Sequence, residues 1–355
     1  MHNLKVLNNK EYAEFTREHL APGWMKGEEK MKMILDLDTG IDDGMALAYV
    51  LGSEDIDLLG VVGTYGNVYT ENGVQNVLNI LEMCQAPAIP VYEGEKHAIQ
   101  KSGFLRLEVS ARIHGDNGVG QVSMKKAQRR KEDQSGVDFL ISSVKKYKKD
   151  LVIVATGPMT NLASALIKAP EIAEIMGPVV IMGGALTIPG NVTPYAEANI
   201  SQDPFAAKYL FESGVDVTMV GLDVTQRSVL TKESTSSWRE TGSTAGRVFA
   251  DMVDYYIGEH DACIGGCFLH DPSAVAAAKN RQWFQMLPMH MTVVTEGEAA
   301  GRTIGSQEKL RDGNPNVKVC IGVNDKALEE DLDKNLQNLF IRCGKSREDK
   351  NGCSE

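Results

Sequence analysis

An aspartate-rich turn between an apolar strand and a helix constrains this chain more than any other feature. In ILDLDTGIDDGMALAYVL (34–51), a short apolar run carries Asp36 and Asp38, turns, and continues with helical periodicity after Asp42 and Asp43. Side chains alternate along a strand, so Asp36 and Asp38 should share a face. Asp42 and Asp43 fall at a helix N-terminus, which favours negative charge. Four carboxylates this close repel one another unless a cation or raised pKa values offset the charge, so the pattern favours a cation site over a helix cap with solvated acids.

A hard divalent cation with oxygen ligands fits this cluster best, because aspartate is its abundant ligand type. Zinc fits poorly, since the chain has no HExxH motif and Cys263 and Cys267 form an isolated pair. An EF-hand loop also fails. Counted from Asp36, its sixth position is Ile41 instead of glycine and its twelfth is Leu47 instead of glutamate.

Short β-rich runs alternate with helical runs over most of the chain, which is typical of a mainly parallel sheet covered by helices. We therefore expect an α/β fold with an open, mainly parallel, Rossmann-like central sheet and an active site at the carboxyl ends of its strands. Strands are predicted at 33–38, 58–65, 151–156, 179–184 and 217–224, and near 289–295 and 317–323. Helices are predicted at 42–52, 70–84, 136–149, 160–168, 204–213, 245–258, 272–279 and 325–341.

No linker or change of composition divides the 355 residues, so one domain is expected at 32–342, with an N-terminal extension at 1–31 and a polar C-terminal tail at 343–355. The 37 Lys and Arg against 48 Asp and Glu give a net charge of −11. This charge argues against nucleic acid or an anionic membrane as a partner. Sparse cysteines and the lack of a long apolar segment predict a cytoplasmic protein.

Two later segments place polar side chains after predicted strands. The loop after 179–184 carries Asn191, Glu197 and Asn199, whose amides and carboxylate suit a ligand with several hydroxyl groups. An ordinary loop can have the same composition. Further on, His270 and Asp271 precede an alanine-rich helix, where Asp271 is also a natural N-cap. Neither segment identifies a function by itself.

Taken together, these segments resemble the inosine-uridine preferring nucleoside hydrolase family, from Met33 to the last predicted helix. The family's opening signature, D-x-D-x-G-x-D-D, appears at 36–43. The motifs that follow in order are Gly66-Asn67, Ile113-His114-Gly115, Thr156-Gly157-Pro158, Met182-Gly183-Gly184, the loop from Gly190-Asn191 to Asn199, and His270-Asp271.

The resemblance implies hydrolysis of the N-glycosidic bond of ribonucleosides to free base and ribose, within nucleoside salvage and purine metabolism. It implies a calcium ion (Ca²⁺) held by the side chains of Asp38, Asp43 and Asp271 and by the main-chain carbonyl of Thr156. Asp38 would also take the proton from the calcium-bound water. The family's usual homodimer or homotetramer is expected as well.

The resemblance also implies which residues bind the substrate. The ribose-binding groups would be Asp42, Met182, Asn191, Glu197 and Asn199, with Asn67 near the 2′ side. His270 is the candidate general acid, because imidazole titrates near neutral pH. His114 is expected on a mobile flap that contacts the base. The stretch 259–271 lacks the aromatic that often lies over the base in this family, and Tyr255 or Tyr256 could replace it if the helix register allows.

Two alternatives stay open at this point. A haloacid-dehalogenase-like phosphatase is possible, since Asp36-Leu37-Asp38-Thr39-Gly40 echoes its strand-end pair of aspartates. That reading predicts a phosphate-binding lysine and leaves the loop around Glu197 unexplained. The second alternative is a non-catalytic nucleoside-binding protein, against which the intact Asp38 and Asp43 argue.

Overall fold

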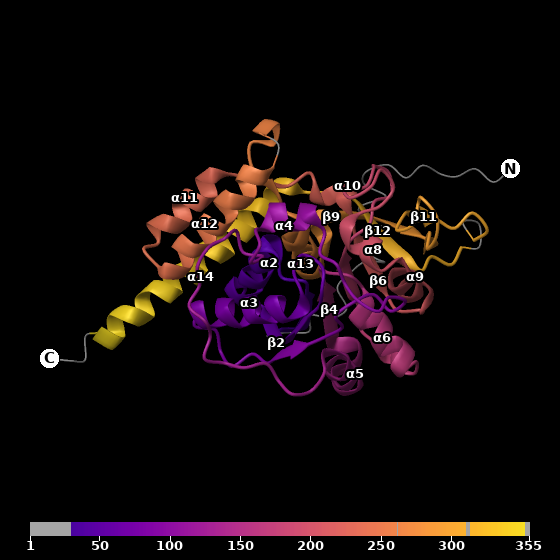
Figure 1. The fold of residues 1–355 in the computed structure, drawn as a ribbon, viewed down its shortest axis with the longest axis horizontal. Coiled ribbons are helices and arrows are strands. Elements are labelled where there is room, and N and C mark those ends of the chain that lie inside the picture. The colour runs from indigo at the N-terminus through magenta and orange to yellow at the C-terminus, as the bar shows by residue number, and fades with distance from the viewer. Residues whose placement is uncertain (1–29, 261, 310–312, 352–355) are drawn as a thin grey trace.

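An eight-stranded sheet forms the centre of the molecule (Figure 1). The structure is a computed structural model that describes residues 30–260, 262–309 and 313–351. The strand order is β3-β2-β1-β4-β5-β6-β12-β9. All neighbours pair in parallel except β12 and β9, which are antiparallel. The predicted α/β class with an open, mainly parallel sheet is therefore confirmed.

The strands and helices are bounded as follows. The sheet consists of β1 (Met31–Leu37), β2 (Ile56–Gly63), β3 (Val91–Glu93), β4 (Leu151–Ala155), β5 (Val179–Met182), β6 (Val217–Val220), β9 (Phe284–Met289) and β12 (Val317–Val323). Two small antiparallel sheets pair β7 (Val229–Leu230) with β8 (Cys267–Phe268), and β10 (Met291–Val293) with β11 (Thr303–Gly305). The helices are α2 (Ile41–Gly52), α3 (Thr70–Met83), α4 (Glu108–His114), α5 (Gly136–Tyr147), α6 (Thr160–Lys168), α7 (Ile172–Ile175), α8 (Ala198–Gln202), α9 (Pro204–Glu212), α10 (Leu222–Thr225), α11 (Lys232–Glu240), α12 (Thr244–Glu259), α13 (His270–Lys279) and α14 (Asp325–Asn351).

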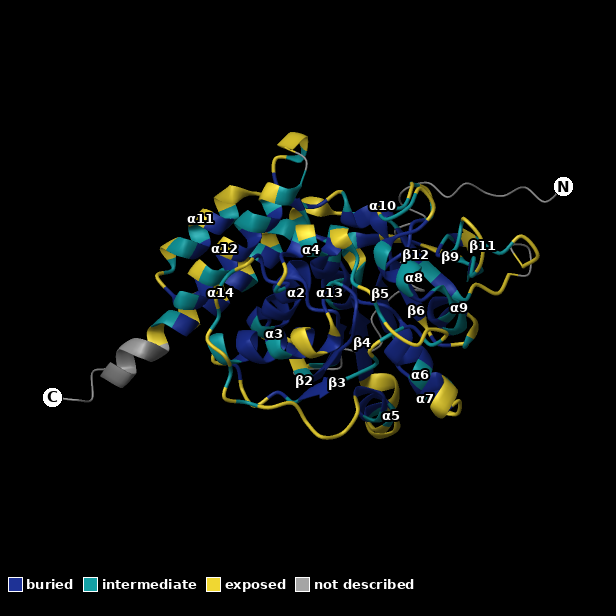
Figure 2. Cartoon of the chain, in the orientation of Figure 1, coloured by how far each residue is buried: buried dark blue, intermediate teal, exposed yellow. Residues whose placement is uncertain are grey.

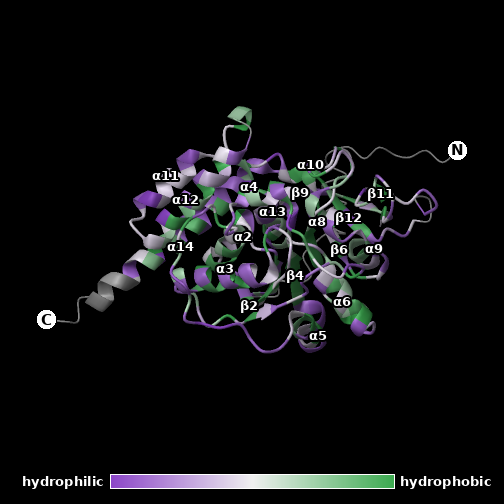
Figure 3. Ribbon diagram, viewed as in Figure 1, coloured by the Kyte–Doolittle hydropathy of each residue, from purple (hydrophilic) through white to green (hydrophobic). Residues whose placement is uncertain are grey.

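Both faces of the sheet are covered, which explains why its strands read as continuous apolar runs (Figures 2 and 3). On β1, Leu35 and Leu37 pack into a cluster with α2, α3, α12, α13 and α14. Ile34 points to the other face and packs with α5, α6 and α9. The first face carries the elements that contribute most of the site described below.

The strand order reverses between β1 and β4, which are neighbours in the centre of the sheet. The chain proceeds from β1 to β2 and β3 on one side, and from β4 to β5 and β6 on the other. Open α/β sheets bind ligands in the crevice that such a reversal leaves at the carboxyl ends of the strands. Asp38 follows β1 and Thr156 follows β4, so both lie at this crevice.

Several predicted boundaries differ from the structure. The strand predicted at 217–224 ends at Val220, because α10 begins at Leu222 and its Asp223 accepts hydrogen bonds from the loop after β5. The strand predicted near 289–295 is divided between β9 and β10, and α4 and α11 were not predicted. These differences lie in short elements, where local sequence patterns are weakest.

The two ends of the chain lie only partly within the described residues. Residues 1–29 and 352–355 lie outside the described residues, and β1 begins at Met31. Helix α14 continues to Asn351, past the predicted start of the tail at 343, and buried Cys343 donates a hydrogen bond to the Cys84 carbonyl. In the described ranges, no helix combines the length and apolar composition needed to cross a membrane.

Candidate active site

A buried group of aspartates lies at the central strand ends. One side-chain oxygen from each of Asp42, Asp43 and Asp271 lies within 4.8 Å of the other two. The Asp38 carboxyl lies close to that of Asp43, which raises the cost of ionising Asp38. Carboxylates this close repel one another unless a proton or a cation offsets the charge. The predicted convergence of acids from 36–43 and 270–271 is therefore present.

Burial raises the pKa of each of these four aspartates, and repulsion from neighbouring carboxylates raises the pKa of Asp38, Asp43 and Asp271 further. The shift is largest for Asp38, next to Asp43, and for Asp271, next to Asp42. Within the described part of the chain, Asp271 Oδ2 is buried without any hydrogen-bond partner. An unpaired buried carboxylate oxygen inside an all-oxygen cluster fits a hard divalent cation.

Asn67 holds Asp38 in one orientation. Its backbone N–H donates to Asp38 Oδ2 at 2.8 Å, and its side-chain Nδ2 donates to Oδ1 at 3.0 Å. Gly66 allows this close approach, because it has a φ of 152° and a Cβ at this position would collide with the Asp38 carboxylate. Asn67 and Asp38 therefore lie together in one site.

Asp43 is held by the two strand ends that meet here. Its Oδ2 accepts the Gly40 N–H at 2.7 Å and thereby caps α2, while its Oδ1 accepts the Thr156 hydroxyl at 2.6 Å. The main-chain carbonyl of Thr156, predicted to be a metal ligand, accepts Asn199 Nδ2 at 2.6 Å. A carbonyl has a second lone pair, so this bond leaves it able to bind a cation.

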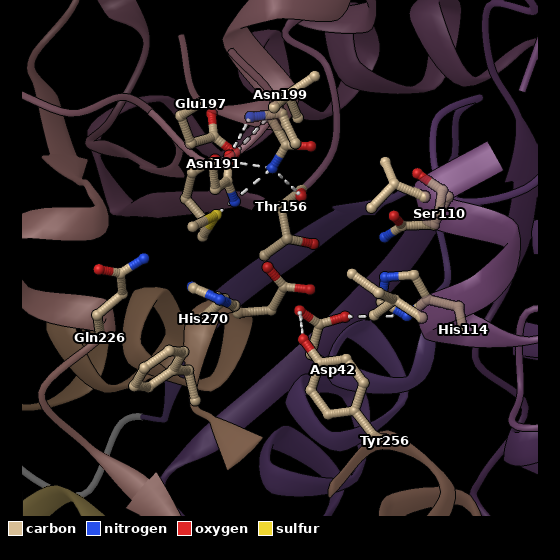
Figure 4. A pocket seen from close by; sticks show the side chains of 18 of the residues that line it. Asp42, Ser110, His114, Thr156, Asn191, Glu197, Asn199, Gln226, Tyr256 and His270 are labelled. Carbon is tan, nitrogen blue, oxygen red and sulfur yellow. Dashed lines mark hydrogen bonds and ion pairs between the residues drawn. The ribbon is translucent and has the colours of Figure 1, made fainter. Parts of the chain in front are cut away.

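The predicted ribose-binding loop lies across the pocket from the aspartates, and Figure 4 shows Glu197, Asn191 and Asn199 grouped together there. Glu197 caps α8 and accepts the N–H groups of Gly184, Asn199 and Ile200 at 2.9–3.1 Å. Asn199 Nδ2 also donates to the Met182 carbonyl at 3.1 Å. Asn191 Oδ1 accepts the Ala198 N–H at 3.0 Å. The backbone itself therefore fixes these side chains.

The two histidines predicted for the site are both buried and fixed. His114 is the last residue of α4, and its Nδ1 accepts the Ile41 N–H at 3.2 Å. His270 opens α13, and its Nδ1 lies 2.8 Å from Thr225 Oγ1. Burial lowers the pKa of His114 to about 4 and that of His270 to about 3. Both rings are therefore neutral at pH 7.

Asp36 lies behind the pocket and is not among the residues that line it. Its Oδ1 accepts Asn161 Nδ2 at 2.8 Å, and its main-chain carbonyl accepts the Thr156 N–H at 2.9 Å. Burial raises the pKa of Asp36 to about 7. Asp36 therefore supports Asn161 and the end of β4 from behind the pocket.

These residues enclose a cavity with about 870 Å³ of empty space, part of it open to solvent (Figure 4). Among the described residues that line it there is no lysine or arginine. Pocket residues that sequence reasoning missed are Val109, Ser110, Val192, Ala198, Gln226, His260 and Phe268. Gln226 and Phe268 follow or end very short elements and carry no periodic signal that could have identified them.

Aromatic rings form one wall of the pocket. Tyr256 lies 5.4 Å from His114 and 4.5 Å from His260, and Phe268 lies 5.7 Å from His260 and 5.8 Å from His270, measured between ring centroids. Of the two tyrosines considered above, Tyr256 lines the pocket, whereas the Tyr255 hydroxyl donates to the Arg112 carbonyl outside it. Tyr256 continues the buried face of α12 at helical spacing, a signal that the sequence already contained.

Residues 33–330 match the family model described as inosine-uridine preferring nucleoside hydrolase. Uridine nucleosidase 1 of Arabidopsis thaliana is 35% identical over 288 residues, which cover 80% of this chain and 85% of that protein. Pyrimidine-specific ribonucleoside hydrolase RihA of Klebsiella pneumoniae is 31% identical over 310 residues, covering 86% and 98% respectively. The structure of a purine-preferring ribonucleoside hydrolase from Gardnerella vaginalis is similar with a TM-score of 0.86 at 49% identity, covering 88% of this chain and 99% of that one.

The matched range contains nearly all of the sheet and of the helices, including every residue that lines the pocket. The similar proteins differ in the bases that their names mention, so the comparisons identify the family without identifying one base. The chain belongs to the inosine-uridine preferring nucleoside hydrolase family.

Proposed function

We propose that this protein hydrolyses the N-glycosidic bond of ribonucleosides and releases the free base and ribose. The observation that carries this proposal is the buried cluster of Asp42, Asp43 and Asp271, which shares one pocket with the hydroxyl-binding groups of Glu197 and Asn199. The family match and the nucleoside substrates named for its relatives support it. The phosphatase alternative is not supported, since the described pocket residues include no lysine to bind phosphate.

Breaking this bond builds positive charge on the sugar ring, so the site must stabilise that charge, activate a water and assist the departing base. A calcium ion bound by Asp38, Asp43, Asp271 and the Thr156 carbonyl would supply a Lewis acid that polarises the water. Asp38 accepts the proton of the water, with its carboxylate oriented by Asn67. Fixed carboxylates around the ring stabilise the developing charge.

The ribose hydroxyls are assigned to groups on two sides of the pocket. Asp42 lies on the side of the acidic cluster, while Asn191, Glu197 and Asn199 lie on the opposite side (Figure 4), where Asn199 contacts Met182. Because most of these side chains are already held by backbone hydrogen bonds, they bind the sugar without large loss of side-chain entropy. The resemblance alone supports a homodimer or homotetramer in nucleoside salvage, and the cytoplasmic location rests on the composition of the sequence.

His270 is assigned to the leaving base. Thr225 occupies its Nδ1, which leaves Nε2 as the ring atom available to the base. In the free enzyme the ring is neutral at pH 7, so it donates one hydrogen bond to the base, and a full general-acid step requires proton uptake after the substrate has bound. His114 contributes to the same wall through its stacking on Tyr256.

The base is proposed to lie against Tyr256 and Phe268, whose rings offer a stacking surface. Gln226 lines the same pocket as His270 and lies to its left in Figure 4. Its side-chain amide makes no hydrogen bond to any described residue. A free amide donor and acceptor next to the leaving-group histidine is suited to the polar edge of a nucleobase.

We expect chelation to abolish ribose release from inosine or uridine in a reducing-sugar assay, and added Ca²⁺ to restore it. Calcium should also raise the unfolding temperature, because a ligand at 100 times its Kd stabilises the native state by about 2.7 kcal/mol. Phosphate release from phosphomonoesters, with no ribose release from any nucleoside, would contradict the proposed function.

Asp38→Asn should lower kcat by about 10² to 10⁴, because the water loses its proton acceptor. Circular dichroism should show that the variant remains folded. Asp57→Asn, at an exposed position on β2, is the matched control and should keep full activity. Near-normal turnover of Asp38→Asn would remove Asp38 as the proton acceptor.

His270→Ala should slow inosine hydrolysis far more than hydrolysis of 4-nitrophenyl riboside, because an activated leaving group needs little assistance. Comparing kcat/KM for the two substrates checks this, with His290→Ala, outside the pocket, as the control. Equal losses on both substrates would exclude a leaving-group role for His270.

Gln226→Glu should lower kcat/KM about tenfold for inosine and uridine, whose oxo groups lose a donor, and much less for adenosine and cytidine, which still find an acceptor. Gln282→Glu introduces the same charge at an exposed position outside the pocket and serves as the control. A uniform loss on all four nucleosides and on 4-nitrophenyl riboside would place Gln226 on the sugar instead of the base.

A further inference from the structure

Arg106 directs its whole guanidinium group to main-chain carbonyls. Its Nε donates to the Asn67 carbonyl, and its Nη1 donates to the Asp116 carbonyl at 2.9 Å. Its Nη2 donates to the carbonyls of Gly115 at 2.8 Å and Ser110 at 3.3 Å. Arg106 forms no ion pair with a carboxylate in the part of the chain that the structure describes. A half-buried charge that binds four carbonyls indicates a residue that holds backbone segments together.

Three of these bonds, to Ser110, Gly115 and Asp116, hold the C-terminal end of α4. This helix has only seven residues and ends at Gly115, which has a φ of 75°. Isolated helices of this length are unstable, and their last carbonyls have no partner inside the helix. The Arg106 guanidinium binds the Ser110 carbonyl inside α4 and the Gly115 and Asp116 carbonyls just after it, and its positive charge matches the helix dipole. Arg106 therefore stabilises α4 in its observed position.

Helix α4 matters because it forms a wall of the pocket. Val109, Ser110, Ile113 and His114 line the cavity from this helix, and His114 caps the start of α2 beside Asp42. On its outer side α4 is held by Arg112, which pairs with Glu259 at 3.1 Å on α12. Arg106 supplies the bond on the opposite side, towards the turn after β2.

The fourth bond, from Arg106 Nε, joins α4 to Asn67, the residue that orients Asp38. Asn67 offers its N–H and Nδ2 to the two oxygens of Asp38, and its carbonyl accepts Arg106. One residue therefore separates the guanidinium from the carboxylate assigned to proton transfer. Arg106 itself is not among the residues that line the cavity.

We propose that Arg106 is a positioning residue that locks α4 over the pocket and, through Asn67, fixes the orientation of Asp38. This inference rests on the proposed function, which assigns proton transfer to Asp38. Arg106 contacts neither substrate nor reacting atoms, so its effect must pass through Asn67 and α4.

A double-mutant cycle tests whether Arg106 acts through Asn67. Arg106→Ala is expected to lower kcat about tenfold or more, since loosely held catalytic groups cost rates of this size. Because both residues orient the same Asp38 carboxylate, the loss of kcat from Arg106→Ala should be clearly smaller in the Asn67→Ala background than in the wild type. Arg130→Ala, an exposed arginine remote from the pocket residues, should leave kcat and KM unchanged.

Conservative replacement and chemical rescue distinguish positioning from general stability. Arg106→Lys keeps the positive charge but loses the planar set of N–H donors, so its kcat should lie between those of Arg106→Ala and the wild type. Millimolar guanidinium should raise kcat of Arg106→Ala and leave Asn67→Ala unchanged, while ethylammonium should do less. Additive losses in the cycle, a wild-type kcat in Arg106→Ala, or a change in KM alone would overturn the proposal.

Hydrogen exchange followed by mass spectrometry separates this inference from the proposed function. Arg106→Ala should accelerate exchange both in 108–118 and around Asn67, whereas Arg130→Ala should not. Unchanged exchange in both segments would overturn the proposed role of Arg106 even if turnover fell. If wild-type protein released no ribose from any nucleoside, the proposed function would fail, while the exchange result would still decide whether Arg106 joins the two segments.

Discussion

Electrostatic repulsion among buried carboxylates is the constraint on which this site depends. Asp42, Asp43 and Asp271 are nearly inaccessible to solvent, and their oxygens lie within 4.8 Å of one another. Burial and proximity both penalise the ionised forms, so the cluster must share protons or bind a cation. A divalent cation would resolve the conflict and would also supply a Lewis acid for the proposed hydrolysis, which would connect the stability of the site to its chemistry.

The surrounding structure satisfies most of the other polar atoms, so that few groups remain free to bind a ligand. Glu197, Asn191 and Asn199 are held by backbone groups, and Asp38 is held by Asn67. Two pocket residues differ, because Asp271 Oδ2 and the Gln226 amide have no hydrogen-bond partner among the described residues. The first faces the proposed cation and the second faces the proposed base, so free polar atoms occur where a ligand would complete the site.

Much of the fold and the central chemistry could be predicted from the sequence, because the signals are local. The apolar run that ends at Asp38, the helix that opens at Asp42 and Asp43, and the strand-helix alternation all follow from residues adjacent in the chain. Once a parallel sheet is expected, topology places Asp38 and Thr156 at the same crevice. The residue roles taken from the family resemblance are consistent with this geometry and stay predictions until they are tested.

The sequence by itself determined the α/β class, the strand-turn-helix that carries the aspartates, and the motifs that identify the family, because each depends on periodicity or spacing within a short segment. Only the tertiary structure decided that His114 is a buried cap of α2, that Tyr256 and not Tyr255 faces the pocket, and that Arg106 joins α4 to Asn67. These features arise from contacts between segments distant in the chain, and burial then sets their protonation and hydrogen bonding. No local pattern contains that information, since the partner of each side chain is chosen by the packing of the whole domain.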